Sequence, residues 1–120
     1  MDYFCGYKTH ISGEVTHLFF AHPKSVELFK HYSEVLLMDC TYKTNCFNIP
    51  LLNIIGTTAL GTSFFIGFVF MSGETNKDYL WGIKELKTLM HGEDICDPAV
   101  VVTDWELALM NALKEVFPWQ

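Results

Sequence analysis

The chain has 120 residues, 50% of them hydrophobic, which is enough to build one domain around one sizeable core. Its 8 Lys and Arg stand against 14 Asp and Glu, and this net charge of -6 excludes attraction to a phosphate backbone by bulk electrostatics. The four cysteines form no C-x-x-C pair and the first residues form no signal-peptide pattern, which predicts a reduced, intracellular protein.

The first 33 residues predict a hairpin followed by a short helix. Aromatic and polar side chains are mixed on either side of Ser12-Gly13-Glu14, a turn-forming segment. A helix is expected to begin at Pro23, because proline is favoured at the first helical position, with Val26 and Phe29 on its inner face. Residues 1–33 are therefore expected to lead into the core.

Three strands are predicted next. Val35 to Met38 form a short apolar run that ends in Asp39, a pattern typical of a central strand covered on both faces. Phe47 to Thr57 and Ser63 to Met71 are the other two. The uncharged stretch Leu51 to Met71 is long enough to cross a bilayer as a helix. Its centre is rich in glycine and threonine and no basic flank follows, so two buried strands are the favoured interpretation and no membrane association is expected.

The pattern then becomes helical. Asn76 to Met90 carries apolar residues at helical spacing, and Gly92 is a stop signal. A short β-branched strand, Ala99 to Val102, ends at Thr103-Asp104. A final helix is expected from Trp105 to Val116. The order of these elements predicts one α/β domain.

Two aspartates share one context, since Asp39 and Asp104 each follow an apolar strand. If the two strands are parallel neighbours, both carboxylates lie at the same edge of the sheet, where ligands of α/β proteins bind. The hairpin and helix between them are long enough for the crossover that parallel pairing requires. Two close carboxylates repel each other unless they share a proton or bind a cation, and Mg²⁺ suits such oxygen ligands.

Other interpretations of the polar residues were weighed. Asp104 begins a predicted helix, where aspartate is an ordinary N-cap, so capping and metal binding remain alternatives. Asp39 has no helix after it to cap, and a carboxylate without a partner at the end of a buried strand is costly. The spacing of Cys5, His10 and His17 matches no tetrahedral zinc site, so a zinc site is rejected and these histidines are taken as structural or exposed.

Short motifs recur along the chain in a recognisable order: Asp39-Cys40-Thr41-Tyr42-Lys43-Thr44-Asn45, Pro50-Leu51-Leu52, Ser72-Gly73-Glu74, Thr103-Asp104, and Asn111-Ala112 with Phe117-Pro118. In this order they resemble the transposase domain of Mutator-like elements (MULE), which is also similar to transposase-derived transcription factors of plants. The upstream segment Thr16 to Pro23 resembles the segment that precedes that domain. The resemblance therefore spans nearly the whole chain.

The resemblance implies a ribonuclease H-like mixed sheet with flanking helices over residues 34–120. It also implies DDE chemistry with Mg²⁺ or Mn²⁺, in which Asp39 is the first acid and Asp104 the second. The family's third acid, a glutamate, lies beyond a C-x-x-H motif, and neither occurs before Gln120. We therefore expect a core truncated at its C-terminus, without its fifth strand, that is inactive alone. The alternative is a non-catalytic transposase-derived domain used in protein interaction or transcription regulation.

Further residues have two interpretations each. Glu74 lies near the point where ribonuclease H supplies a further metal carboxylate, but an acid at a helix start is equally favoured by the helix dipole. Tyr42, Lys43 and Asn45 follow the first acid, and either position the strand end or a phosphate, or serve as surface and packing residues. The family also implies DNA as a partner through regions outside this chain, a homo-oligomer, and a nuclear or cytoplasmic rather than secreted protein.

Overall fold

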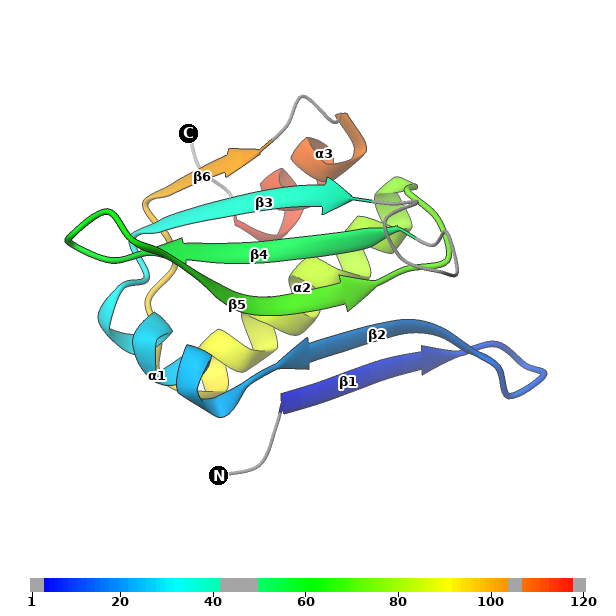
Figure 1. The fold of residues 1–120 in the computed structure, drawn as a ribbon. Helices are drawn as coiled ribbons and strands as arrows, with labels where there is room; N and C mark the ends of the chain where they lie inside the picture. The colour runs from blue at the N-terminus through cyan, green and yellow to red at the C-terminus, as the bar shows by residue number, and fades with distance from the viewer. Residues whose placement is uncertain (1–3, 42–49, 104–106, 118–120) are drawn as a thin grey trace.

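The computed structural model describes residues 4–41, 50–103 and 107–117. Within these residues, six strands form one mixed sheet in the order β1-β2-β5-β4-β3-β6, accompanied by three helices (Figure 1). The predicted α/β class is therefore confirmed. The elements are β1 (Phe4–Thr9), β2 (Val15–Ala21), α1 (Pro23–His31), β3 (Val35–Thr41), β4 (Leu51–Thr57), β5 (Ser63–Phe70), α2 (Asn76–Gly92), β6 (Val100–Thr103) and α3 (Leu107–Val116).

The predicted N-terminal hairpin is confirmed as the antiparallel pair β1 and β2. Its turn is closed by a hydrogen bond from the His10 N–H to the Glu14 carbonyl, 2.8 Å long, and Gly13 adopts a positive φ of 91° that glycine tolerates best. Strand β2 also pairs with β5, from Leu18 opposite Phe70 onward. The hairpin is thus continuous with the main sheet.

Helix α1 begins as the sequence predicts. Pro23 occupies the start of the helix, and the His22 ring accepts a hydrogen bond of 3.0 Å from the Lys24 N–H as the N-cap. Val26 and Phe29 are buried in the core. The helix packs against β5.

The uncharged stretch forms strands β4 and β5, as predicted, joined by a turn in which Gly61 has a positive φ of 83°. Strands β4 and β5 are antiparallel neighbours, and β4 is also an antiparallel neighbour of β3. In the described part of the chain, no helix is long and apolar enough to cross a membrane.

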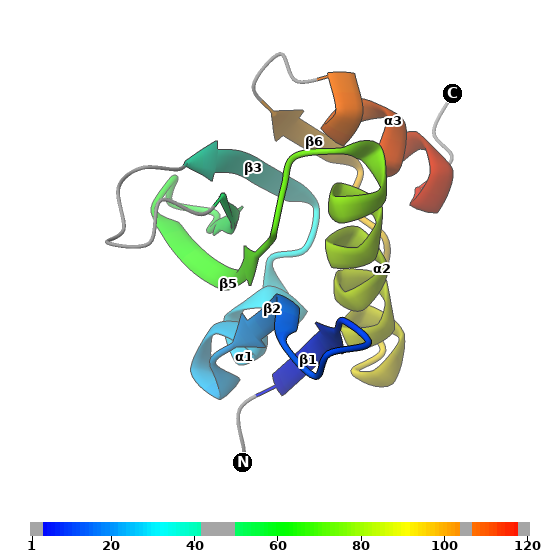
Figure 2. The same ribbon diagram turned by 90° about the vertical axis from the view of Figure 1, so that its right-hand side faces the viewer.

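Two expectations about β3 are wrong. The strand does not have both faces covered, because Leu36 and Met38 lie in the core while Val35 is 37% exposed and Leu37 is half-buried. The physical reason is visible in Figure 2, where α2 and α3 lie on the same face of the sheet. Nor does the strand end at Asp39, since its pairing with β4 continues for two more residues.

Helix α2 is confirmed, with bounds two residues longer at its C-terminal end than predicted. Its N-cap is Thr75, whose hydroxyl accepts a hydrogen bond from the Asp78 N–H while the Asp78 carboxylate accepts one from the Thr75 N–H. The Asn76 amide donates to the Ala108 carbonyl over 3.2 Å, which ties the first turn of α2 to α3. These two helices pack side by side over the core.

Gly67 is required where two strands approach closely. A Cβ atom at this position of β5 would lie 2.7 Å from the Phe20 carbonyl oxygen of β2, which is backbone and cannot rotate away. We expect Gly67→Ala to lower the free energy of unfolding by about 1–3 kcal/mol through overpacking. Gly92→Ala is the matched control, since nothing lies within 4 Å of its Cβ position. Equal urea midpoints for the two variants would contradict this packing account.

Candidate functional site

Asp39 lies inside β3, directly opposite Asn53 of β4. The Asn53 side-chain amide donates a hydrogen bond of 3.2 Å to the Asp39 carbonyl oxygen, which adds a side-chain bond to the backbone pairing of the two strands. Asp39 itself is half-buried. Its backbone is therefore fixed by a strand with neighbours on both sides, which suits a residue whose carboxylate must be held in place.

Strand β6 lies on the other side of β3 and runs parallel to it. Met38 pairs with Thr103, the last residue of β6, and the next residue along each chain segment is an aspartate, Asp39 or Asp104. The parallel neighbours that the two-aspartate hypothesis requires are thus present. The side chain of Asp104 lies outside the described residues, as do those of Tyr42, Lys43 and Asn45, so a shared site stays a prediction.

Glu74 lies between β5 and α2 and contacts β3 at Cys40. The Cys40 thiol donates a hydrogen bond of 3.4 Å to the Glu74 carboxylate. Cys40 packs against the core, and successive side chains of a strand point to opposite faces, so the carboxylate of Asp39 projects away from the face that Glu74 contacts. Glu74 therefore contacts Cys40, the residue after Asp39, and not Asp39 itself in this hydrogen bond.

Burial raises the pKa of the Cys40 thiol to about 11. A hydrogen bond from Tyr79 acts in the opposite direction, and the negative carboxylate of Glu74 reinforces the increase. The thiol is therefore protonated at neutral pH and serves as a donor to Glu74.

The donors of this region suit a hard cation. Asp39 and Glu74 offer carboxylate oxygens, the ligand type that Mg²⁺ and Mn²⁺ prefer, but from opposite faces of β3. Within residues 4–41, 50–103 and 107–117, no group of three or more His, Cys, Asp or Glu side chains is close enough to hold a metal ion. A complete site would thus need Asp104 or a further ligand in addition to the described carboxylates.

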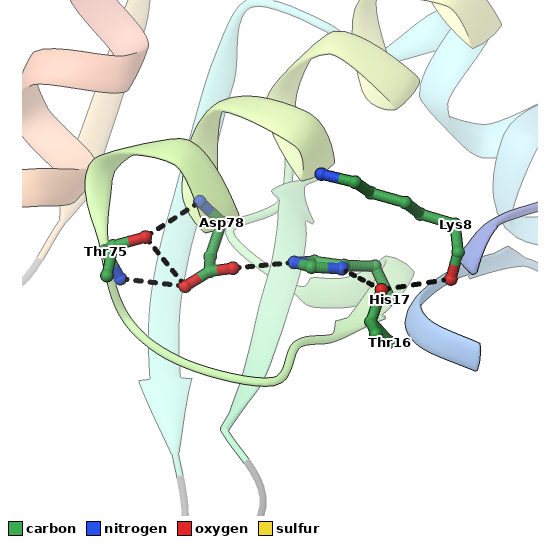
Figure 3. A network of polar contacts seen from close by, with 5 residues as sticks. All are labelled: Lys8, Thr16, His17, Thr75 and Asp78. Atoms are coloured by element: carbon green, nitrogen blue, oxygen red, sulfur yellow. Dashed lines mark hydrogen bonds and ion pairs between the residues drawn. The ribbon is translucent and has the colours of Figure 1, made fainter. Parts of the chain in front are cut away.

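A second polar cluster joins β2 to α2 and was not predicted. His17 is 5% exposed, and its Nε2 lies 2.7 Å from the Asp78 Oδ1 (Figure 3). On the other side of the ring, Nδ1 lies 2.9 Å from the Thr16 hydroxyl, which donates to the Lys8 carbonyl over 3.1 Å. Because Asp78 is a carboxylate, the Nε2–H of His17 donates to it. The ring is thus held on both sides, by Asp78 of α2 and by Thr16 of its own strand.

Asp78 is a nearly buried carboxylate with several donors. Burial would raise its pKa, but hydrogen bonds from His17 and from the backbone and hydroxyl of Thr75 outweigh burial and lower the pKa below 3.8. The Thr75 hydroxyl donates over 2.8 Å and its N–H over 3.0 Å to the Asp78 Oδ2. Asp78 thus serves both as a capping residue of α2 and as the hydrogen-bond partner of His17.

The sequence held a signal for this cluster. His17 occupies an inward position of β2, in alternation with the buried Phe19 and Ala21, and a buried histidine requires a partner. Thr75 and Asp78 stand at capping-box spacing before an apolar helical pattern. The partnership itself could not be predicted, because 61 residues separate His17 from Asp78.

The protonation of Cys40 leads to a measurable prediction. With a pKa of about 11, the thiol should react with an alkylating reagent slowly at pH 7 and faster as the pH approaches 11. Glu74→Gln should lower the midpoint, because Glu74 raises the pKa. The measurement is the alkylation rate against pH with the other three cysteines replaced by serine. An unchanged midpoint in Glu74→Gln would show that the contact is without effect.

Asp78 should stabilise the fold in a pH-dependent way. Because its pKa is lowered on folding, the stabilisation is present above the unfolded value of about 3.9 and is lost as the pH falls through the folded value. We expect Asp78→Ala to cost about 2–3 kcal/mol at pH 7, and less at pH 2.5, in urea unfolding. Asp97→Ala, which breaks the exposed pair with Lys87, should cost at most about 1 kcal/mol. Equal losses in the two variants would contradict a special role for Asp78.

Comparisons with known proteins show which family this sequence resembles. The family model described as the MULE transposase domain matches residues 35–120. Protein FAR1-RELATED SEQUENCE 5 of Arabidopsis thaliana is 26% identical over 104 residues, which is 87% of this chain and 13% of that protein. Protein FAR-RED IMPAIRED RESPONSE 1 of the same plant is 29% identical over 101 residues, 84% of this chain and 12% of that protein.

A fungal protein is also similar. The PKS-NRPS hybrid synthetase cheA of Chaetomium globosum is 37% identical over 87 residues, which is 72% of this chain but 2% of that protein. The chain thus spans a small part of the length of each of these relatives, and the synthetase name describes the whole fungal protein. The family match covers most of the chain and begins at the start of β3. This chain belongs to the MULE transposase domain family.

Proposed function

We propose that the chain is part of a DDE transposase core with a ribonuclease H-like arrangement, in which Asp39 and Asp104 bind Mg²⁺ or Mn²⁺ for DNA cleavage and strand transfer. The strand order supports this fold: β5, β4 and β3 are successive antiparallel neighbours, and α2 then crosses over to β6, parallel to β3. The observation that carries the proposal is the pairing of Met38 with Thr103, each followed in the sequence by an aspartate.

The residues of the chain would act by holding carboxylates at fixed positions. The backbone of Asp39 is held by the pairing of β3 and by the Asn53 side chain, so the main chain is already ordered before a cation binds. Asp39 and Asp104 would hold divalent ions, which would supply activation of the attacking oxygen and stabilisation of the leaving oxygen of a phosphodiester. Glu74 would join this site only if its carboxylate left Cys40 and reached the face of β3 that carries the Asp39 side chain.

The DNA itself is proposed to be bound through regions outside this chain. With a net charge of -6, the 120 residues offer no excess of cations for phosphates. The relatives from Arabidopsis thaliana are about eight times longer than the matched part, since the match covers 12–13% of them. A homo-oligomer and a nuclear location are further proposals that the family membership suggests.

A non-catalytic role in protein interaction or transcription regulation is the second candidate. It is favoured by apolar side chains on the sheet face opposite α2 and α3, where Val35, Phe65, Val100 and Val102 are 37%, 53%, 50% and 50% exposed. Paired residues of neighbouring strands share a face, and Val35 lies opposite Val100. Exposed apolar surface of this kind is typical of contact with another protein or segment.

Cation binding separates the two candidates. We expect the parent chain to bind Mn²⁺ and Asp39→Asn to weaken binding about tenfold or more, because one of two anionic ligands is lost. Unfolding should stay cooperative, since removing one of two repelling charges costs little stability. Mn²⁺ binding followed by electron paramagnetic resonance measures this, with Asp97→Asn as the control carboxylate. Unaltered affinity in Asp39→Asn, or absence of binding in the parent, would favour the non-catalytic role.

Nicking of a supercoiled plasmid with Mn²⁺ tests the catalytic part. We expect the 120-residue chain to nick no faster than the Asp39→Asn/Asp104→Asn control, because two aspartates leave a second ion with too few protein oxygens. Nicking well above that control would refute inactivity and identify Glu74 as a third ligand.

A further inference from the structure

We propose that His17 is a positioning residue for the candidate site and acts through the turn between β5 and α2 that carries Glu74. The N-terminal hairpin, which lies before the family match at residues 35–120, would then form part of the support of the site. This inference rests on the proposed function for the identity of the site, whereas the mechanical link can be measured without a metal.

The first step of the link is a pair of bonds to opposite oxygens of one carboxylate. Asp78 Oδ1 contacts His17 Nε2 at 2.7 Å, and Asp78 Oδ2 accepts the Thr75 N–H at 3.0 Å (Figure 3). That N–H belongs to the peptide bond that joins Glu74 to Thr75. Because His17 holds the Asp78 carboxylate, that carboxylate in turn holds the Glu74–Thr75 peptide in one orientation. The orientation of this peptide determines where the Glu74 side chain points.

The turn has little room to adopt another position. A Cβ atom on Gly73 would lie 3.0 Å from the Asp78 Oδ2, so the backbone before Glu74 lies close to the same carboxylate. At the far end of the link, the Glu74 carboxylate accepts the Cys40 thiol, which is next to Asp39 in β3. The link thus runs from the hairpin to the strand that carries the first acid.

The burial of the pair makes the link specific. The side chains of His17 and Asp78 are 5% and 13% exposed, and the Trp81 ring, on the next part of α2, lies with its centroid 5.4 Å from that of His17. A buried carboxylate that loses its partner is left with an unmet desolvation cost and must move or draw in water. Loss of His17 should therefore first change the position of the Asp78 carboxylate and of the turn at Thr75 that is bonded to it.

Hydrogen–deuterium exchange tests the link in the parent chain and in three variants. In His17→Ala, the amides of Thr75, Asp78 and Tyr79 should exchange about tenfold faster or more, while amides near Leu86 keep their protection. His17→Gln should restore protection, because its side-chain amide can still donate to Asp78. His10→Ala is the matched control, since this exposed histidine of the same hairpin bonds only within its own turn in the described structure.

Two exchange results would overturn the proposal. One is unchanged exchange at Thr75 to Tyr79 in His17→Ala. The other is a uniform increase over the whole of α2 that His17→Gln does not reverse, which would mean that His17 contributes only to global stability. A local increase with rescue by glutamine supports it.

A second arm connects the link to the site. Where the parent binds Mn²⁺, His17→Ala should weaken binding about tenfold, because the turn whose Glu74 bonds Cys40, next to Asp39, is no longer held in place, and His17→Gln should not weaken it. In a Glu74→Gln background the effect of His17→Ala should disappear, and its persistence there would show that His17 does not act through Glu74. If the parent binds no Mn²⁺, the proposed function fails, and the exchange result alone decides whether the link exists.

Discussion

The parallel pairing of β3 with β6 is the constraint on which the rest of the structure depends. Parallel neighbours cannot be joined by a tight turn, so the chain must cross over, and α2 makes that crossing on one face of the sheet. The position of α2 in turn places its N-terminal turn beside β3, where Glu74 meets Cys40. The same pairing places Met38 opposite Thr103. It thereby fixes, side by side, the two strand residues that directly precede Asp39 and Asp104 in the sequence.

Patterns local in the sequence predicted most of the fold. The hairpin around Gly13, the start of α1 at Pro23 and the extent of α2 all follow from turn residues, capping and helical spacing. The faces of β3 were predicted wrongly because an unbroken apolar run looks the same whether one face or both are covered; Val35 and Leu37 face away from the core. The contacts of the site depend on residues distant in sequence, as with Cys40 and Glu74 or His17 and Asp78, and no local pattern specifies such pairs.

Stability and site geometry share the same carboxylates. Asp78 completes the capping box of α2 and pairs with a buried imidazole, so a carboxylate in the first turn of the helix also attaches the hairpin to it. Glu74 accepts a thiol whose pKa of about 11 keeps it protonated, and this contact joins the turn to β3 without a second negative charge. Meanwhile the opposite face of the sheet keeps Val100 and Val102 exposed, which leaves an apolar surface available to a protein partner whether or not the site is catalytic.

The central claim is that Asp39 and Asp104 share one divalent cation, and anomalous diffraction from crystals soaked in Mn²⁺ tests it most directly. The account predicts an anomalous peak about 2.1 Å from a carboxylate oxygen of each aspartate, just beyond the Met38–Thr103 pair of β3 and β6. Carboxylates more than about 10 Å apart, or a peak bound by neither residue, would contradict the claim, because such a separation is beyond any shared coordination.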